Sequence, residues 1–153
     1  MNSHDTMCER CDGLCCHVYD IFDTESGKHV KKAGEKCGHL DTKNKCRIYN
    51  ARSKHSGFKE SCDIYDCLEA GPIVTIFARR ISDDFPMKYA IISSLLETIR
   101  TRIIYANTPE EGKKILDFTA SILMYIKIDE KIHLSVKVAR IKIQLWIDPD
   151  TTL

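Results

Sequence analysis

The sequence predicts a mostly α-helical protein with an irregular, cysteine-rich module over residues 1–71 and a bundle of about three helices over residues 72–153. Three observations support this division. All eight cysteines of the 153-residue chain lie between positions 8 and 67, and six of its seven glycines lie before position 72. The second half instead carries aliphatic residues at helical spacing. Ala70-Gly71-Pro72 marks the boundary, because Gly and Pro together stop a regular element.

The first region has few large aliphatic side chains, so it cannot bury enough apolar surface to offset its chain entropy. We therefore expect loops and short helical turns that something other than an apolar core must hold. Residues 8–16 should turn around Gly13. Residues 37–40 and 46–49 should form a short hairpin, with residues 41–45 as its polar turn.

Two helices are predicted in the second half, one from its apolar face and one from its capped start. Residues 86–106 place apolar side chains three or four positions apart. These are Met87, Ala90, Ile91, Leu95, Ile99 and Ile103. The next helix should begin at Thr108-Pro109-Glu110-Glu111, because Thr108 can cap it, Pro109 suits its first position and Glu111 completes a capping box. Its inner face would be Ile115, Thr119, Ile122 and Ile126.

A third helix could begin after Asp129. Its apolar face would hold Ile132, Val136, Ala139, Ile143 and Trp146. The same stretch also alternates between apolar and polar residues and is rich in β-branched side chains, which favour a strand. Helix is the prediction here and strand the alternative.

Composition narrows the classes of function. The net charge of +1 argues against a dedicated nucleic-acid binder, which usually carries a strongly basic face. No apolar run reaches the ~18 residues of a membrane span, and the N-terminus does not resemble a secretory signal. We therefore expect a cytoplasmic protein with neither a membrane nor a nucleic-acid partner. Disulfides do not persist in the cytosol, so the clustered cysteines are predicted to bind metal.

The expected metal ligands are cysteine thiolates. They are Cys8, Cys11, Cys15, Cys16, Cys37, Cys46, Cys62 and Cys67. A Cys-x-x-Cys pair lets two thiolates reach one ion, at roughly 2.3 Å each for zinc. Eight thiolates suffice for two four-thiolate sites or for one polynuclear cluster with shared sulfurs. The adjacent Cys15 and Cys16 should point in different directions and serve different ions or bridge two. Zinc is the expected metal, and an iron–sulfur cluster is the alternative, because both suit all-thiolate shells.

Other polar residues are weaker candidates for metal binding or catalysis. His17 and His39 follow cysteines closely enough to complete a metal shell, but a place beside the ligands or on the surface is the simpler interpretation. Asp66, Tyr49 and Arg52 should orient the loops or hydrogen-bond to sulfur. No catalytic residue is assigned, because no nucleophile is paired with a base at recognisable spacing.

The order of these residues resembles a known family. The pattern is Cys8-x-x-Cys11-x-x-x-Cys15-Cys16, Cys37-x-x-Leu40, Cys46-Arg47-Ile48-Tyr49-x-x-Arg52, Phe58-x-x-x-Cys62 and Cys67. It resembles the CxxCxxCC family of zinc- or iron-chelating cysteine-rich proteins over about the first half of the chain. The chain departs from that pattern by one extra residue before Cys15 and by Ser53, where the family usually has Pro. The resemblance implies metal chelation by the matching cysteines and no settled activity.

Three functions remain open from the sequence. The first is a zinc-binding module with a structural or partner-binding role, in which the helical region could contact a protein partner or form a homodimer. The second is an iron–sulfur protein with a redox or enzymatic role. The third is a metal storage or delivery protein, which would need exposed and exchangeable thiolates.

Overall fold

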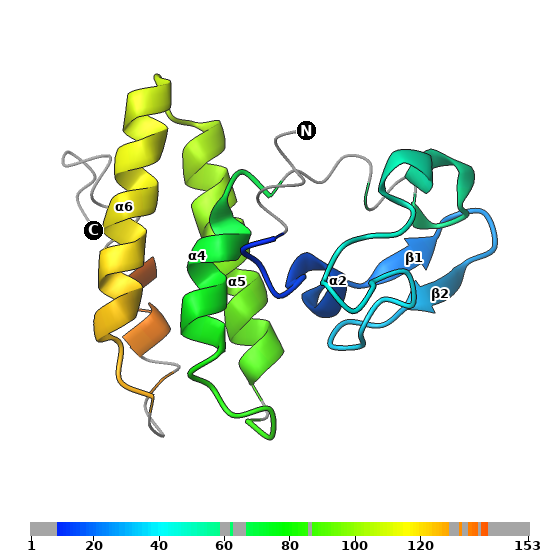
Figure 1. The fold of residues 1–153 in the computed structure, drawn as a ribbon, viewed down its shortest axis with the longest axis horizontal. Coiled ribbons are helices and arrows are strands. Elements are labelled where there is room, and N and C mark those ends of the chain that lie inside the picture. Colours follow the sequence, from blue (N-terminus) through cyan, green and yellow to red (C-terminus); the bar gives the residue numbers. More distant parts are fainter. Residues whose placement is uncertain are drawn as a thin grey trace.

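The computed structural model describes residues 9–58, 62, 67–85, 87–128, 132, 135–137 and 139–140. The described part is mostly helical, as predicted. Its elements are α2 (Cys15–Val18), β1 (Ile21–Asp23), β2 (Lys28–Lys31), the 3-10 helix η1 (Tyr49–Lys54), α4 (Ala70–Ala78), α5 (Lys88–Ile104) and α6 (Pro109–Tyr125). Helices α4, α5 and α6 pack on one another at one end of the molecule, and the β1–β2 hairpin lies at the other (Figure 1). None of the described helices is long and apolar enough to cross a membrane.

Helix α5 is the centre of the helical bundle, because it contacts α2, α4 and α6. The predicted inward residues Ile91, Leu95 and Ile99 are buried. Ile92 and Leu96 are fully buried as well, which the single predicted stripe did not include. Since α5 has partners on several sides, its buried face is wider than one stripe. The prediction was wrong at the N-terminal end, where Met87 and Ala90 are exposed.

Helix α6 begins where the capping motif predicted. The Thr108 hydroxyl accepts a hydrogen bond from the Glu111 backbone N–H at 3.1 Å, and Pro109 is the first helical residue. The Glu111 carboxylate accepts from the backbone N–H of Asn107 at 2.7 Å, one residue earlier than a standard capping box. Ile115 and Thr119 are buried, as predicted.

Helix α4 was not predicted, and the interpretation of Ala70-Gly71-Pro72 as a stop was wrong. These residues form the first turn of the helix. Leu68 and Glu69 precede it in left-handed conformations, with φ angles of 47° and 64°. Proline is tolerated in a first turn because its missing N–H has no helical partner there. The helix is apolar on almost every side, so no periodicity revealed it.

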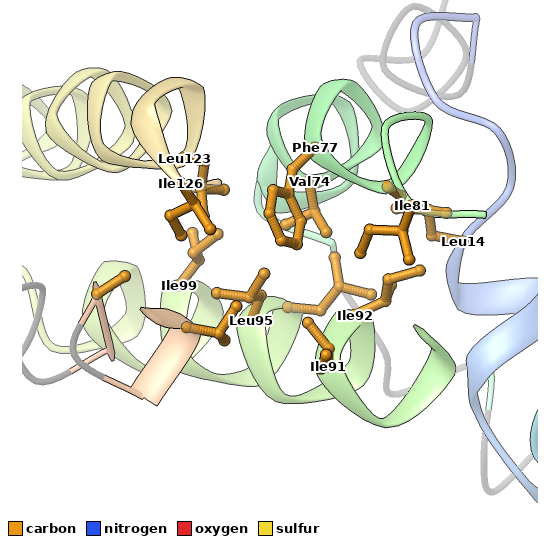
Figure 2. Close-up of a cluster of buried hydrophobic side chains, with 14 of the residues drawn as sticks. Leu14, Val74, Phe77, Ile81, Ile91, Ile92, Leu95, Ile99, Leu123 and Ile126 are labelled. Atoms are coloured by element: carbon orange, nitrogen blue, oxygen red, sulfur yellow. The ribbon is translucent and has the colours of Figure 1, made fainter. Parts of the chain in front are cut away.

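A single apolar core joins the two predicted regions. Leu14 and Val18 come from the cysteine-rich region and pack with residues of α4 and α5. Figure 2 shows Leu14 beside Ile81 and close to Ile92. We call this cluster the main core; it also contains Val74, Phe77, Leu95 and Ile99, among others.

The predicted third helix is supported where the structure describes it. Residues 135–137 and 139–140 are helical, which favours helix over the alternative of a strand. Ile132, Val136 and Ala139 are buried in the main core, on the face predicted for them. Ile143 and Trp146 lie outside the described residues.

The cysteine-rich region contains more regular structure than the loops and turns that were predicted. Strands β1 and β2 form an antiparallel hairpin. It was not predicted, because strands of three and four residues with mostly exposed side chains show no clear pattern in a sequence. The predicted turn at residues 41–45 is confirmed by the Asp41 N–H bond to the Lys45 carbonyl at 2.9 Å. Its flanks pair only at a bridge between Leu40 and Cys46. Gly13 adopts a φ of +66°, and Leu40 packs on it so closely that a Cβ would lie 2.8 Å from that side chain.

Candidate metal centre

The cysteines that the structure describes surround one cavity. It has a volume of about 100 Å³ and lies between the loops of the first region and the start of α4. The cysteines that line it are Cys11, Cys15, Cys16, Cys37, Cys46, Cys62 and Cys67. The remaining lining includes the apolar side chains of Ile21, Leu40 and Phe58. Cys8 lies outside the described residues.

These sulfurs surround the cavity and do not converge on one point. None of the seven described cysteines forms a disulfide. Within the described ranges, no three histidine, cysteine, aspartate or glutamate side chains lie close enough together to hold one ion. The fold therefore gathers thiols at one place without closing a coordination shell around a single centre.

Two of the sulfurs lie against the first turns of α4. The Cys67 sulfur accepts a hydrogen bond from the Gly71 backbone N–H at 3.0 Å, and the Cys11 sulfur accepts one from the Thr75 hydroxyl at 3.5 Å. A Cβ on Gly71 would lie 2.9 Å from each sulfur. The two sulfurs are therefore no further apart than twice that distance.

Cys15 and Cys16 begin helix α2, with their sulfurs 3.9 Å apart. A hydrogen bond from Cys15 lowers the pKa of Cys16, and the positive charges of Lys31 and Arg52 lower it further. The pKa of Cys15 is raised well above its ordinary value by that same hydrogen bond, by burial and by negative charge on the neighbouring thiols. Of this pair, Cys16 is therefore the more acidic thiol.

The other sulfurs belong to the loops. Cys37 is buried, its sulfur accepts from the His39 N–H at 3.5 Å, and its own N–H donates to the Cys16 carbonyl at 2.9 Å. Burial raises the pKa of Cys46, and it raises that of Cys62 to about 11. Negative charge on Cys16 and Cys37 adds to both shifts. Without a cation beside them, Cys46 and Cys62 are therefore less acidic than an ordinary cysteine.

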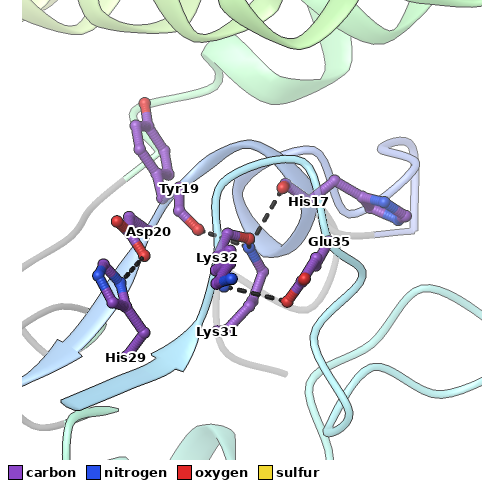
Figure 3. A network of polar contacts seen from close by, with 7 residues as sticks. All are labelled: His17, Tyr19, Asp20, His29, Lys31, Lys32 and Glu35. Atoms are coloured by element: carbon purple, nitrogen blue, oxygen red, sulfur yellow. Dashed lines mark hydrogen bonds and ion pairs between the residues drawn. The ribbon is translucent and has the colours of Figure 1, made fainter.

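Two basic side chains lie close to the loop sulfurs. The Lys31 ammonium donates to the carbonyls of His17 and Lys32, at 3.1 and 3.0 Å, and also to that of Tyr19 (Figure 3). Burial lowers its pKa, against the attraction of Cys37 and Cys16. Arg52 lines the cavity and donates to the Cys62 carbonyl at 2.8 Å. Its guanidinium carbon lies 4.1 Å from the centre of the Tyr49 ring. The predicted role of Arg52 and Tyr49 in orienting the loops is consistent with these contacts.

Neither histidine candidate is among the residues that line the cavity. The His17 ring is parallel to that of Tyr89, with 6.4 Å between centres, and burial lowers its pKa. The His39 ring lies 5.3 Å from that of His55 and 5.0 Å from that of Phe58. These positions beside the cysteines agree with the simpler interpretation of both residues. Asp66 lies outside the described residues.

Sequence reasoning missed three residues of this centre. Gly71 and Thr75 donate hydrogen bonds to cysteine sulfurs from α4, and Lys31 donates one to the carbonyl of His17 in α2. None of the three offered a signal in the sequence, because only the fold brings them near a cysteine.

Comparisons with known proteins identify no relative: no family model matches the chain, and no curated protein or solved structure matches it significantly. The resemblance to the CxxCxxCC proteins therefore stays a prediction from the spacing of the cysteines.

Proposed function

We propose that this chain is a metal-binding protein that holds zinc through clustered cysteine thiolates, in a binuclear or polynuclear centre with a structural or partner-binding role. One observation carries the proposal. Cysteines distributed from Cys11 to Cys67 all line the same small cavity, and none of the seven is used in a disulfide.

Electrostatic repulsion between neighbouring thiolates is the first physical reason to expect a metal ion in this cavity. Burial, together with negative charge on Cys16 and Cys37, raises the pKa of Cys62, so several thiolates are unfavourable together in a partly buried cavity. A divalent cation removes this repulsion and favours the thiolate form. The donor set is entirely sulfur, which suits zinc.

The stability of the cysteine-rich region is a second reason to expect a bound metal ion. Apart from its contribution to the main core, the described part of the first region has a small cluster of buried residues, formed by Ile21, Cys37 and Phe58, and a buried Leu40. A structural zinc site contributes an apparent ~10–16 kcal/mol at neutral pH in small peptides. Binding on that scale is sufficient to order a region with so little apolar burial. The helical region remains the proposed contact surface for a protein partner or a second copy, and the cytosol the proposed location.

Elemental analysis tests the proposal directly. Protein purified without oxygen should contain at least one zinc atom per chain and should be colourless. The absence of both zinc and iron would overturn metal binding by this chain.

Substitution tests the ligands. Cys11→Ser or Cys46→Ser should lower the metal content, because each removes a thiolate from the cavity wall. His55→Ala is the control, since its ring is not part of that wall and contacts His39. Metal content per chain, measured by mass spectrometry, reads out all three variants. Retention of all metal in both cysteine variants would show that the ligands are assigned wrongly.

An iron–sulfur cluster is the second candidate, and one observation favours it. No three donor side chains in the described part lie close enough for a single ion, whereas a cluster supplies its own sulfide and spans a wider ring of thiolates. Brown protein whose visible absorption bleaches on reduction would favour the cluster over zinc.

A further inference from the structure

The start of α4 brings two of the cysteine sulfurs close to one point. A Cβ added to Gly71 would lie 2.9 Å from the sulfur of Cys11 and 2.9 Å from that of Cys67. Both cysteines are partly buried against the main core, and both line the cavity. The missing side chain of Gly71 therefore leaves room for two sulfurs that come from distant parts of the sequence.

Each of these sulfurs accepts a hydrogen bond from α4. The Gly71 N–H donates to the Cys67 sulfur at 3.0 Å, and the Thr75 hydroxyl donates to the Cys11 sulfur at 3.5 Å. Thr75 is 1% exposed, and its hydroxyl also accepts from the N–H of Asp12, the residue after Cys11, at 3.2 Å. Donors one turn apart on a single helix therefore position both sulfurs, and a site built on a helix is more precise than one built on loops.

Two thiolates held in this way match the coordination chemistry of a soft monovalent ion. Thiolate ligands select Cu(I), and Cu(I) accepts two thiolates in a nearly linear arrangement without a further ligand. Two metal–sulfur bonds of roughly 2.3 Å each, the value for zinc, span less than the largest separation possible for these sulfurs. The need for only two donors agrees with the described ranges, in which no three histidine, cysteine, aspartate or glutamate side chains lie close enough to share an ion.

The charge of such a complex also suits its position. One Cu(I) ion and two thiolates carry a single net negative charge. The Gly71 N–H belongs to the first turn of α4, which is the positive end of the helix dipole and favours a negative charge. A zinc ion on the same two thiolates would be neutral and would leave two positions of its tetrahedral shell to other ligands.

We propose that Cys11 and Cys67 form a two-thiolate site for Cu(I) at the N-terminal end of α4. Gly71 leaves the room beside both sulfurs, and Thr75 is a positioning residue for Cys11. Binding replaces two thiol protons by one ion, and copper keeps its oxidation state. This inference goes beyond the proposed function, because it assigns a second class of metal to a pair of cysteines. Without copper, both thiolates remain ligands of the proposed zinc centre.

A copper titration tests the site. Full-length protein purified without oxygen receives one equivalent of Cu(I), as its acetonitrile complex, in competition with the Cu(I) chelator bathocuproine disulfonate. The wild type should retain the ion, and X-ray absorption should show two sulfur neighbours and no copper–copper contact. Cys11→Ser and Cys67→Ser should each weaken binding by more than about 100-fold, since the loss of a ligand costs more than the loss of a hydrogen bond to one. Three sulfur neighbours, a copper–copper contact or no binding would overturn the site.

A third cysteine variant separates this site from the zinc centre. Cys46 lines the same cavity but is not one of the two proposed copper ligands. Cys46→Ser should therefore lose zinc, as proposed above, and still bind one Cu(I) as tightly as the wild type. Weaker binding of that ion by Cys46→Ser would overturn the two-thiolate site. Purified protein with neither zinc nor iron would instead overturn the proposed function and leave the copper site standing.

Substitutions in α4 test the site with every cysteine in place. Gly71→Ala adds a methyl group 2.9 Å from both sulfurs, and Thr75→Val removes the donor to Cys11. Each should weaken Cu(I) binding by about 10–100-fold, whereas Thr75→Ser keeps the hydroxyl and should bind like the wild type. Gly112→Ala is the matched glycine control, because its methyl would meet only ordinary contacts at 3.8 and 4.0 Å. Thr119→Val is the matched threonine control, because its buried hydroxyl has no hydrogen-bond partner among the described residues. Unchanged affinity in Gly71→Ala or in Thr75→Val would contradict the proposed site.

Discussion

At the scale of single residues, the environment of each thiol differs although the residue type is the same. Cys16 accepts a hydrogen bond from Cys15 and lies in the field of Lys31 and Arg52, which lowers its pKa. Partial burial and the negative charge of neighbouring thiols raise the pKa of Cys62 to about 11. Neighbouring thiols in one cavity should therefore have different reactivities.

Alkylation measures this difference in metal-free protein. A lowered pKa leaves more thiolate at a given pH, so Cys16 should react with iodoacetamide faster than Cys15, Cys46 and Cys62 at pH 8. Cys62 should react slowly until the pH approaches 11. Peptide mass spectrometry across pH 6–11 would give both profiles, and identical profiles would contradict the assignment. Arg52→Gln should shift the Cys16 profile to higher pH, because a positive charge is lost.

At the scale of elements, helices and strands that depend on a local sequence motif were easier to predict than those that depend on packing. The start of α6 was predicted correctly because its capping motif is local, whereas α4 was missed because its apolar sequence has no pattern to detect. The inner face of α5 was predicted in part, since its extra buried residues depend on which neighbours pack on it. The β1–β2 hairpin was missed because strands of three and four residues carry too few side chains to show alternation.

The hydroxyl that caps α6 should contribute measurably to the free energy of unfolding. Thr108→Ala removes the acceptor for the Glu111 N–H and should lower the free energy of unfolding by about 1 kcal/mol. Thr101→Ala, at an exposed position within α5, is the control and should change it by less than about 0.5 kcal/mol. Urea denaturation reads out both variants. Equal effects would indicate that the cap does not stabilise the helix in this protein.

At the scale of the whole molecule, two kinds of interaction hold different parts. The bundle rests on the main core, in which Leu95, Leu96 and Ile99 are fully buried. The first region contributes Leu14 and Val18 to that core, and Arg79 of the α4 C-cap pairs with Asp12 at 2.6 and 2.7 Å. Its loops beyond α2 depend on the small buried cluster of Ile21, Cys37 and Phe58 and, in our proposal, on metal.

Chelation should separate these two contributions. Removal of metal by a strong chelator should accelerate amide hydrogen exchange in residues 37–48 by at least tenfold and leave residues 91–99 protected. The reason is that the main core does not require the metal, whereas the loops have little else to order them. The helical circular dichroism signal should be largely retained. Cooperative loss of protection in both segments would show that the bundle also depends on the metal.

The sequence by itself determined the helical second half, the capped start of α6 and the eight cysteines as candidate ligands, because these depend on residue type and short spacing. Only the tertiary structure decided that the seven described cysteines line one cavity, that Gly71 and Thr75 reach two of the sulfurs, and that both regions share one core. The reason is that such relations join positions far apart along the chain, and packing around α4 and α5 fixes distances that no local pattern encodes.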